Sequence, residues 1–146
     1  MVSRRNLIIG GVVVVAAVGI GAAVAGNNGS DSNKKNFSVA MVTDVGGVDD
    51  KSFNESAWNG VKAWGKSHDL KKGANGYDYF ASKTNADFAT NFQQGVSAKY
   101  SMLIGVGYAT NDALVASAKQ NPKTDYVLVD DVASKQYKNI ASLTFK

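Results

Sequence analysis

The sequence of 146 residues contains no cysteine and a single histidine, His68. The absence of cysteine excludes disulfides, thiol nucleophiles, zinc–thiolate sites and iron–sulfur clusters within the chain, and one histidine excludes a multi-histidine metal centre. Proline is equally scarce, since it occurs only as Pro122, and no repeat or biased tract dominates. This composition is that of a globular protein, not of a disordered one.

Arginine is almost as rare, because Arg4 and Arg5 are the only two. The formal net charge is +4, and without this pair the lysines outnumber the acids by only two. A nucleic-acid-binding protein is expected to gather arginine and lysine on one face. The charge balance therefore does not indicate a nucleic-acid partner.

Several signatures of catalysis are also missing. The sequence has no phosphate-binding loop of the Walker type, no G-x-G-x-x-G that opens a helix and no G-x-S-x-G nucleophile elbow. Asp49 and Asp50 are adjacent carboxylates, but without a third close ligand we expect them to cap a helix or face solvent and not to bind a metal. We therefore expect no enzyme, no catalytic residue, no metal and no cofactor.

The N-terminus, residues 1–25, has the pattern of a targeting segment. Arg4 and Arg5 precede an uncharged apolar stretch over residues 7–25, which is close to the length that crosses a bilayer as a helix. This hydrophobic helix is expected to be either a signal peptide, cleaved after the small residues 23–25, or an uncleaved membrane anchor. Residues 26–35 are polar and rich in Gly, Ser and Asn, as in a flexible linker, so the folded domain is expected over residues 36–146.

The domain alternates short apolar runs with segments of helical periodicity. Strands are expected at 37–43, 77–81, 101–106, 125–129 and 140–145, and helices at 52–66, from Thr84 or Asn85 onward, and at 111–120. In the first helix the inward face is expected to carry Phe53, Ala57, Val61 and Trp64, with Asp50 or Ser52 as its cap. This order predicts an α/β domain with a mainly parallel sheet flanked by helices.

Polar and aromatic residues follow the strands of this sheet. In open parallel sheets, ligands bind beyond the carboxyl ends of the strands. An aromatic ring beside an amide and carboxylates suits a flat, hydroxylated, neutral ligand. Alternatives remain open: Phe53 as a core residue, Asp44 as a turn-stabilising side chain, and the two last aspartates as a solvated strand end. The candidate binding residues are Asp44, Phe53, Asn54, Tyr108, Asp130 and Asp131.

Residues 39–65, VAMVTDVGGVDDKSFNESAWNGVKAWG, closely resemble the opening of the basic membrane protein family. Residues 105–114, 121–122 and 127–132 are similar to later family segments in the same order. The family comprises substrate-binding components of ABC importers and includes purine nucleoside receptors.

The resemblance implies the type I periplasmic-binding-protein fold, of which this chain would be the first lobe. It implies that Phe53 stacks on a purine base, that Asp44 and Asn54 contact the base or line the pocket, and that Asp130, or else Asp131, accepts from ribose hydroxyls. Tyr108 is a pocket-lining expectation from its loop position. The implied partners are a purine nucleoside or similar small polar ligand and the ABC permease subunits.

Two departures from the family pattern shape these expectations. Family members usually carry a lipid-modified cysteine after the signal, which this chain lacks, so tethering would depend on the N-terminal helix. Members are also considerably longer, so a truncated chain with a single lobe is expected to bind weakly or not at all. We expect an extracytoplasmic substrate-binding component, held at the cell membrane or secreted after cleavage. The alternative is a membrane-tethered, truncated surface or interaction domain that has lost transport.

Overall fold

The computed structural model describes residues 8–9, 12–13 and 35–145. The chain divides into two compact units, Met1–Lys35 and Asn36–Lys146, which are described separately. In the first unit, β1 (Ile8–Ile9) pairs antiparallel with β2 (Val12–Val13). A hydrophobic helix was expected there, but these four residues form two short strands, and the other residues of 7–25 lie outside the described ones. Nowhere in the described part of the chain does a helix combine the length and apolar character needed to cross a membrane.

The second unit is an α/β domain. Its strands are β3 (Val39–Val42), β4 (Tyr77–Phe80), β5 (Met102–Val106), β6 (Asp125–Val129) and β7 (Ile140–Leu143). They form one sheet in the order β4-β3-β5-β6-β7, and every pairing in it is parallel. The expected mainly parallel sheet is confirmed.

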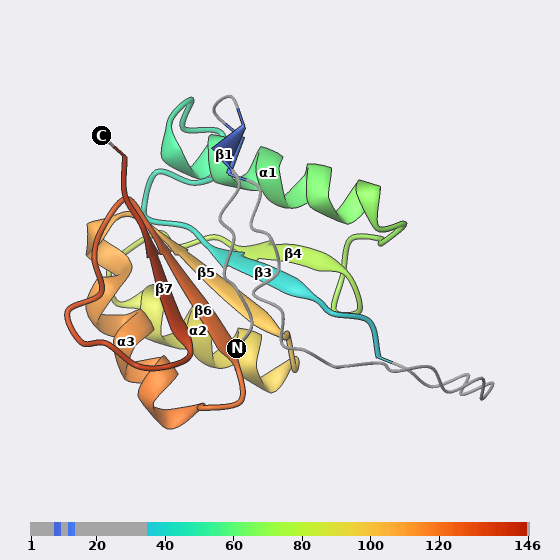
Figure 1. The fold of residues 1–146 in the computed structure, drawn as a ribbon. Helices are drawn as coiled ribbons and strands as arrows, with labels where there is room; N and C mark the ends of the chain where they lie inside the picture. Colours follow the sequence, from blue (N-terminus) through green and yellow to red (C-terminus); the bar gives the residue numbers. More distant parts are fainter. Residues whose placement is uncertain (1–7, 10–11, 14–34, 146) are drawn as a thin grey trace. The chain divides into compact units, whose positions relative to one another are not determined.

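Three helices connect the strands. They are α1 (Phe53–Ser67), α2 (Asp87–Ser97) and α3 (Asn111–Gln120), the last preceded by the short 3-10 helix η1 (Tyr108–Thr110). In Figure 1, α1 lies on one face of the sheet, whereas α2 and α3 cover the other. Right-handed crossovers produce this arrangement, because the chain moves outward from β3 in one direction to β4 and later in the other to β6. The strand order therefore reverses between β3 and β5, where α/β sheets hold ligands.

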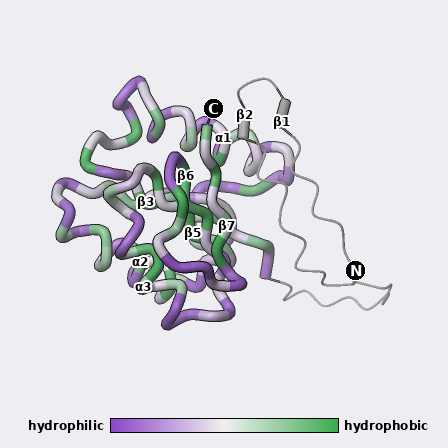
Figure 2. Tube along the Cα trace, turned by 60° about the vertical axis from the view of Figure 1, so that its left-hand side comes forward, coloured by the Kyte–Doolittle hydropathy of each residue, from purple (hydrophilic) through white to green (hydrophobic). Residues whose placement is uncertain are grey.

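Both faces of the central strands are buried. Every residue of β3 and β5 is buried, as expected for parallel strands covered on both sides. Ala40, Val42 and Leu103 pack against Phe92 and Leu114 of the helices below the sheet. The hydropathy colouring in Figure 2 shows the resulting contrast between the hydrophobic central strands and the mainly hydrophilic outer loops. The carboxyl ends of these strands are thus held in place by a packed core.

The helices differ from the sequence prediction in two places. In α1 the buried residues are Asn54, Trp58, Val61 and Gly65, so the inward face is shifted and Phe53 is not part of it. The shift arises because Asn54 is held inside by polar bonds, which periodicity of apolar residues does not register. Helix α2 begins at Asp87 and not at Thr84 or Asn85, because Asp87 Oδ2 accepts from the backbone N–H of Lys83 and Thr84 and holds a turn before the helix.

Candidate functional site

The candidate site lies at the carboxyl ends of β3, β5 and β6, around the point where the strand order reverses. Asp44 follows β3, and Gly107 follows β5 beside it. Gly107 has a φ of 85°, a conformation that favours glycine, and a Cβ at this position would come within 3.3 Å of Asp44 Oδ2. The glycine thus leaves room for the Asp44 carboxylate at the edge of the sheet.

Asp44 is fixed by a local network of hydrogen bonds. Its Oδ1 accepts from the backbone N–H of Gly46 at 2.7 Å and from Asn54 Nδ2 at 2.6 Å. Its own backbone N–H donates to Asn54 Oδ1 at 3.1 Å. Its Oδ2 makes no hydrogen bond to any described residue. Asp44 therefore combines the turn-stabilising role with a second oxygen that remains available as an acceptor.

Asn54 is the centre of this network. Its side chain is fully buried, and its Nδ2 donates to Asp50 Oδ2 at 2.8 Å as well as to Asp44. The resemblance implied that Asn54 contacts the ligand or lines its pocket. In this structure no atom of Asn54 is exposed. Asn54 instead positions the Asp44 carboxylate by linking the end of β3 to the first turn of α1.

Asp50 caps α1, as one of the two sequence alternatives anticipated. Its Oδ1 accepts from the backbone N–H of Ser52 and Glu55, and its Oδ2 accepts from the N–H of Asn54, whereas Ser52 makes no side-chain cap bond. Burial raises the pKa of this carboxyl, but the bonds from Glu55, Ser52 and Asn54 outweigh burial and hold the pKa below its usual value. The cap is therefore anionic at neutral pH.

Phe53 lies at the rim of the site and not in the core. Its side chain is 43% exposed and packs against Phe145, with the ring centroids 5.7 Å apart. Phe145 follows β7, which is separated from β3 by two strands, so the contact joins distant parts of the carboxyl edge. The alternative of Phe53 as a core residue is wrong for this structure, and an accessible aromatic face remains.

Tyr108, Asp130 and Asp131 complete the set of candidates. Tyr108 stands on η1 and is 78% exposed. Asp130 follows β6 with a φ of 66°, and its side chain makes no hydrogen bond to the described residues. Asp131 is occupied: its Oδ2 accepts from Asn111 Nδ2 at 2.6 Å, and its Oδ1 accepts from the N–H of Val132. Of the two aspartates, Asp130 is therefore the one with free acceptor atoms.

Two features of this edge were not predicted from the sequence. Phe145 was assigned to the last strand, but it lies beyond β7 and forms the aromatic pair with Phe53. The close approach of Gly107 to Asp44 was not predicted either. The parallel order of the strands was the available signal, because it puts the residues after each strand at one edge.

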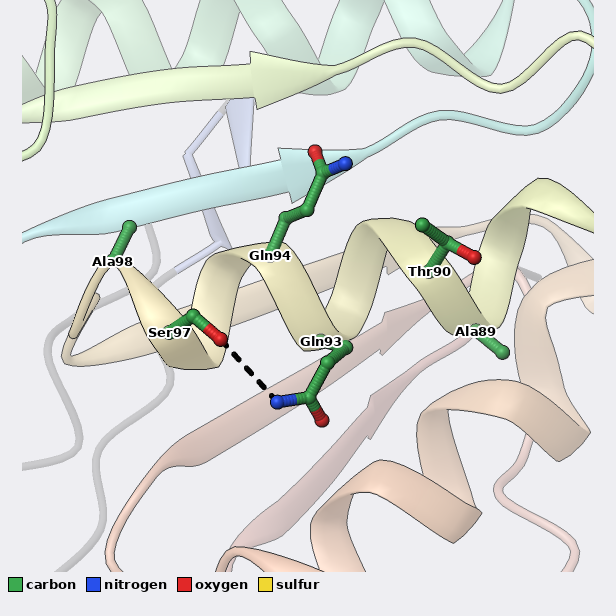
Figure 3. Close-up of a pocket in the computed structure, with 6 residues that line it drawn as sticks. All are labelled: Ala89, Thr90, Gln93, Gln94, Ser97 and Ala98. Atoms are coloured by element: carbon green, nitrogen blue, oxygen red, sulfur yellow. Dashed lines mark hydrogen bonds between the residues drawn. The ribbon is translucent and has the colours of Figure 1, made fainter.

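An open hollow on α2 is a second place where a ligand could rest (Figure 3). Gln93 Nε2 donates to Ser97 Oγ across it at 3.3 Å, and it has no charged residue. It is lined by one helix and the residue after it, so its walls do not converge on a ligand. Its residues are Ala89, Thr90, Gln93, Gln94, Ser97 and Ala98.

Metal-ligating side chains do not gather at either place. Within the described residues, no three His, Asp or Glu side chains are grouped to hold a metal ion. The carboxyl edge therefore offers hydrogen-bond acceptors and aromatic rings, which is a set suited to binding an uncharged, flat molecule with hydroxyl or amide donors.

The sequence pattern of the family described as PnrA-like ABC transporter substrate-binding proteins matches residues 37–146. The chain belongs to this family. The CD4+ T-cell-stimulating antigen of Listeria innocua is 44% identical to this member over 82% of the chain and 33% of the relative. The ABC transporter nucleoside-binding protein BmpA of Lactococcus lactis is 39% identical over 97% of the chain and 41% of the relative. This PnrA-like chain thus spans roughly a third of the length of the relatives it matches.

Solved structures agree with this assignment. A solute-binding protein of an ABC transporter system from Aeropyrum pernix superposes with a TM-score of 0.63 at 25% identity. The match covers 73% of this chain and 28% of that protein. The expected fold class, one lobe of a substrate-binding protein of this PnrA-like kind, is confirmed for residues that form the parallel sheet and its helices.

Proposed function

We propose that this chain contributes the first lobe of an extracytoplasmic substrate-binding component of an ABC importer, and that its ligand is a purine nucleoside. The carboxyl edge carries an exposed ring on Phe53, and acceptor oxygens on Asp44 and Asp130 that make no hydrogen bond to the described residues. Family membership and the nucleoside-binding name of the Lactococcus relative support the ligand class. Binding and delivery, without chemistry, are the function.

Two observations carry the proposal: the exposed ring of Phe53, and the Oδ2 of Asp44, which makes no hydrogen bond to any described residue. A purine base presents a flat face to the ring and N–H donors at its edge to the carboxylate. The Asp44 side chain is oriented before binding by Gly46 and Asn54, so less conformational freedom is lost when a ligand arrives. Asp130 supplies a second acceptor for the ribose hydroxyls.

The proposal includes a second lobe that packs against this one. Among the described residues, the exposed large hydrophobic side chains all follow the carboxyl end of a strand: Val45, Phe53, Tyr108, Val132 and Phe145. An apolar rim of this kind marks a contact surface. We infer that another lobe closes over it, excludes water and supplies the opposite wall of the ligand site. Alone, this lobe leaves its ligand half exposed and binds weakly.

The proposed location follows from the N-terminus. The positively charged residues Arg4 and Arg5, followed by the apolar stretch over 7–25, support export of the domain and a tether at the outer face of the membrane. Permease subunits of the transporter are the proposed protein partners.

Saturation-transfer NMR on the full chain tests the ligand class, because it detects binding in the millimolar range. Guanosine, inosine and adenosine should receive saturation, with uridine weaker because its base stacks over less area. Phe53→Ala should reduce the transfer, whereas Val132→Ala, which removes a similarly exposed side chain, should not. Absence of transfer to every nucleoside, or an equal loss in both variants, contradicts the proposal.

A further inference from the structure

Lysines gather at the end of the domain opposite the candidate site. Because all five strands of the domain's sheet are parallel, the segments that precede them meet at one amino edge. Lys71 and Lys72 precede β4, Lys123 precedes β6 and Lys138 precedes β7, while Lys66 and Lys119 lie in the last turns of α1 and α3. All six are exposed, and we call them the lysine pole.

Acids are few at this pole and numerous at the other. Among the described residues, Asp69, Asp78 and Asp125 are the acids near the lysines, and Asp78 Oδ1 is 3.7 Å from Lys72 Nζ. The carboxyl edge instead carries Asp44, Asp49, Asp50, Asp130 and Asp131 in its loops, with Lys51, Lys83 and Lys135 as counter-charges. The domain thus has a basic end and an acidic end.

Helix dipoles explain part of this separation. Acids are favourable in the first turn of a helix and bases in the last, which accounts for Glu55 with Lys66 and for Asp112 with Lys119. Lys71, Lys72, Lys123 and Lys138 lie in connections between elements, where the dipole does not require a base. The helix dipole therefore does not account for the positions of these four loop lysines.

The polypeptide enters the domain at the same pole. Asn36 and Phe37 lead into β3 at its amino end, where Val39 donates to the carbonyl of Gly76 in the connection that carries the loop lysines. Residues 26–35 separate this entry from the apolar stretch that ends at residue 25, and ten residues span at most roughly 35 Å. Any bilayer that holds the stretch therefore lies within reach of the lysine pole.

We propose that the lysine pole rests on the anionic headgroups of the membrane to which the chain is tethered. The proposal builds on the tether proposed above. Lysines close to an anionic bilayer are attracted to it within about one Debye length, roughly 8 Å at physiological salt, and the tether keeps them in that range. With the pole on the membrane, Phe53 and Asp44 face away from the bilayer, toward an arriving solute.

The lysine chemistry favours a lipid surface over nucleic acid. The described part of the domain contains no arginine, the residue preferred for bidentate phosphate and base contacts. The lysines come from separate connections and are spread over one end of the sheet, which suits a plane of headgroups. A folded nucleic acid would instead be matched by a continuous stripe or groove.

Site-specific labelling tests the orientation, because the chain has no cysteine of its own. A fluorophore is attached to the full chain through Asn75→Cys, at the lysine pole, or through Asn85→Cys, at the carboxyl edge; both positions are exposed. Each chain is reconstituted in vesicles of phosphatidylcholine with phosphatidylglycerol, or of phosphatidylcholine alone, that contain an energy acceptor on the headgroups. Energy transfer measures how close each label lies to the bilayer surface.

On anionic vesicles the label at position 75 should transfer more energy than the label at position 85. The difference should shrink on neutral vesicles, at high salt, and in the variant Lys66→Gln/Lys71→Gln/Lys119→Gln/Lys123→Gln, where the tether alone orients the domain. The control variant Lys51→Gln/Lys83→Gln/Lys135→Gln, at the opposite edge, should keep it. Equal transfer from both labels on anionic vesicles, or equal effects of the two variants, overturns the proposal.

Flotation of the same samples separates failure of the tether from failure of the pole. A chain that does not float with neutral vesicles lacks a working tether. Its flotation with anionic vesicles then tests the pole alone, and removal of the four lysines should weaken partitioning by roughly tenfold or more. No flotation with anionic vesicles, or binding to an anionic polynucleotide that the vesicles do not compete away, contradicts a lipid partner.

Discussion

Asn54 Nδ2 donates to Asp44 Oδ1 at 2.6 Å, and the backbone N–H of Asp44 donates back to Asn54 Oδ1 at 3.1 Å. This reciprocal pair ties the end of β3 to the start of α1 and engages one oxygen of the Asp44 carboxylate. The other oxygen faces the space that Gly107 leaves open. The buried amide of Asn54 thus orients the carboxylate of Asp44.

Asn54→Ala is expected to destabilise the domain by about 1–3 kcal/mol, because it leaves the partly buried carboxylates of Asp44 and Asp50 without their donor. Urea unfolding followed by circular dichroism measures the change. Asn59→Ala, at an exposed position of the same helix, is the matched control and should change stability by less than about 0.5 kcal/mol. Equal stability of the two variants would show that the network contributes nothing.

Asp50→Asn removes the charge of the α1 cap and should lower stability at neutral pH, because the neutral amide accepts the three backbone N–H bonds less strongly than the carboxylate does. The folded-state pKa of Asp50 is lowered, so the stabilisation by its carboxylate is present above the unfolded-state value of about 3.9. It is lost as pH falls through the lower, folded-state value. The stability difference between wild type and variant should therefore be constant near pH 7 and shrink below about pH 4. Asp49→Asn, at the exposed neighbouring position, should show no such difference in stability from the wild type.

Gly107→Ala should strain the backbone and also press on the Asp44 carboxylate. Gly47→Ala is the matched control, since Gly47 has a similar φ of 72° but nothing within 4 Å of the added Cβ. Both variants should lose about 1–2 kcal/mol of stability from the positive φ. Only Gly107→Ala should shift the NMR signals of the Asp44 and Asn54 side chains. Similar spectra for the two variants would contradict the close approach.

Asp125→Asn should stabilise the domain at neutral pH. Asp125 Oδ2 is buried with no hydrogen-bond partner in the described part of the chain, and burial raises the pKa of this carboxyl. A raised folded-state pKa means that the ionised form costs stability above that pKa, and that the cost disappears as pH falls through it. The advantage of the variant in thermal unfolding should therefore fade on acidification. An advantage that is independent of pH would point to packing and not to charge.

Much of the fold was predictable from local pattern. The apolar runs around Val39, Leu103 and Val127 predicted buried parallel strands because both faces of such strands are covered. Asp44, Tyr108 and Asp130 were predicted at one edge because parallel strands end together. The helix over residues 111–120 was predicted with the bounds that the structure shows.

The errors have a common physical cause. Periodicity of apolar residues put Phe53 on the inward face of α1, but the polar bonds of Asn54 turn that helix so that Phe53 is exposed. The pairing of Phe53 with Phe145 joins residues far apart in sequence, and no local pattern records it. The difference between the free Asp130 and the occupied Asp131 depends on Asn111, which approaches from another helix. Polar and aromatic contacts that apolar periodicity does not register therefore decided these features.

The most direct test of the central claim is an amide NMR map of the full, isotope-labelled chain during titration with guanosine or inosine. If the carboxyl edge binds the nucleoside, saturable shifts are expected there, at Asp44, Phe53, Gly107, Tyr108 and Asp130, with weak affinity and with no response at the lysine pole. Shifts centred on the hollow along α2, or a spectrum that does not change at the solubility limit of the nucleoside, would contradict it.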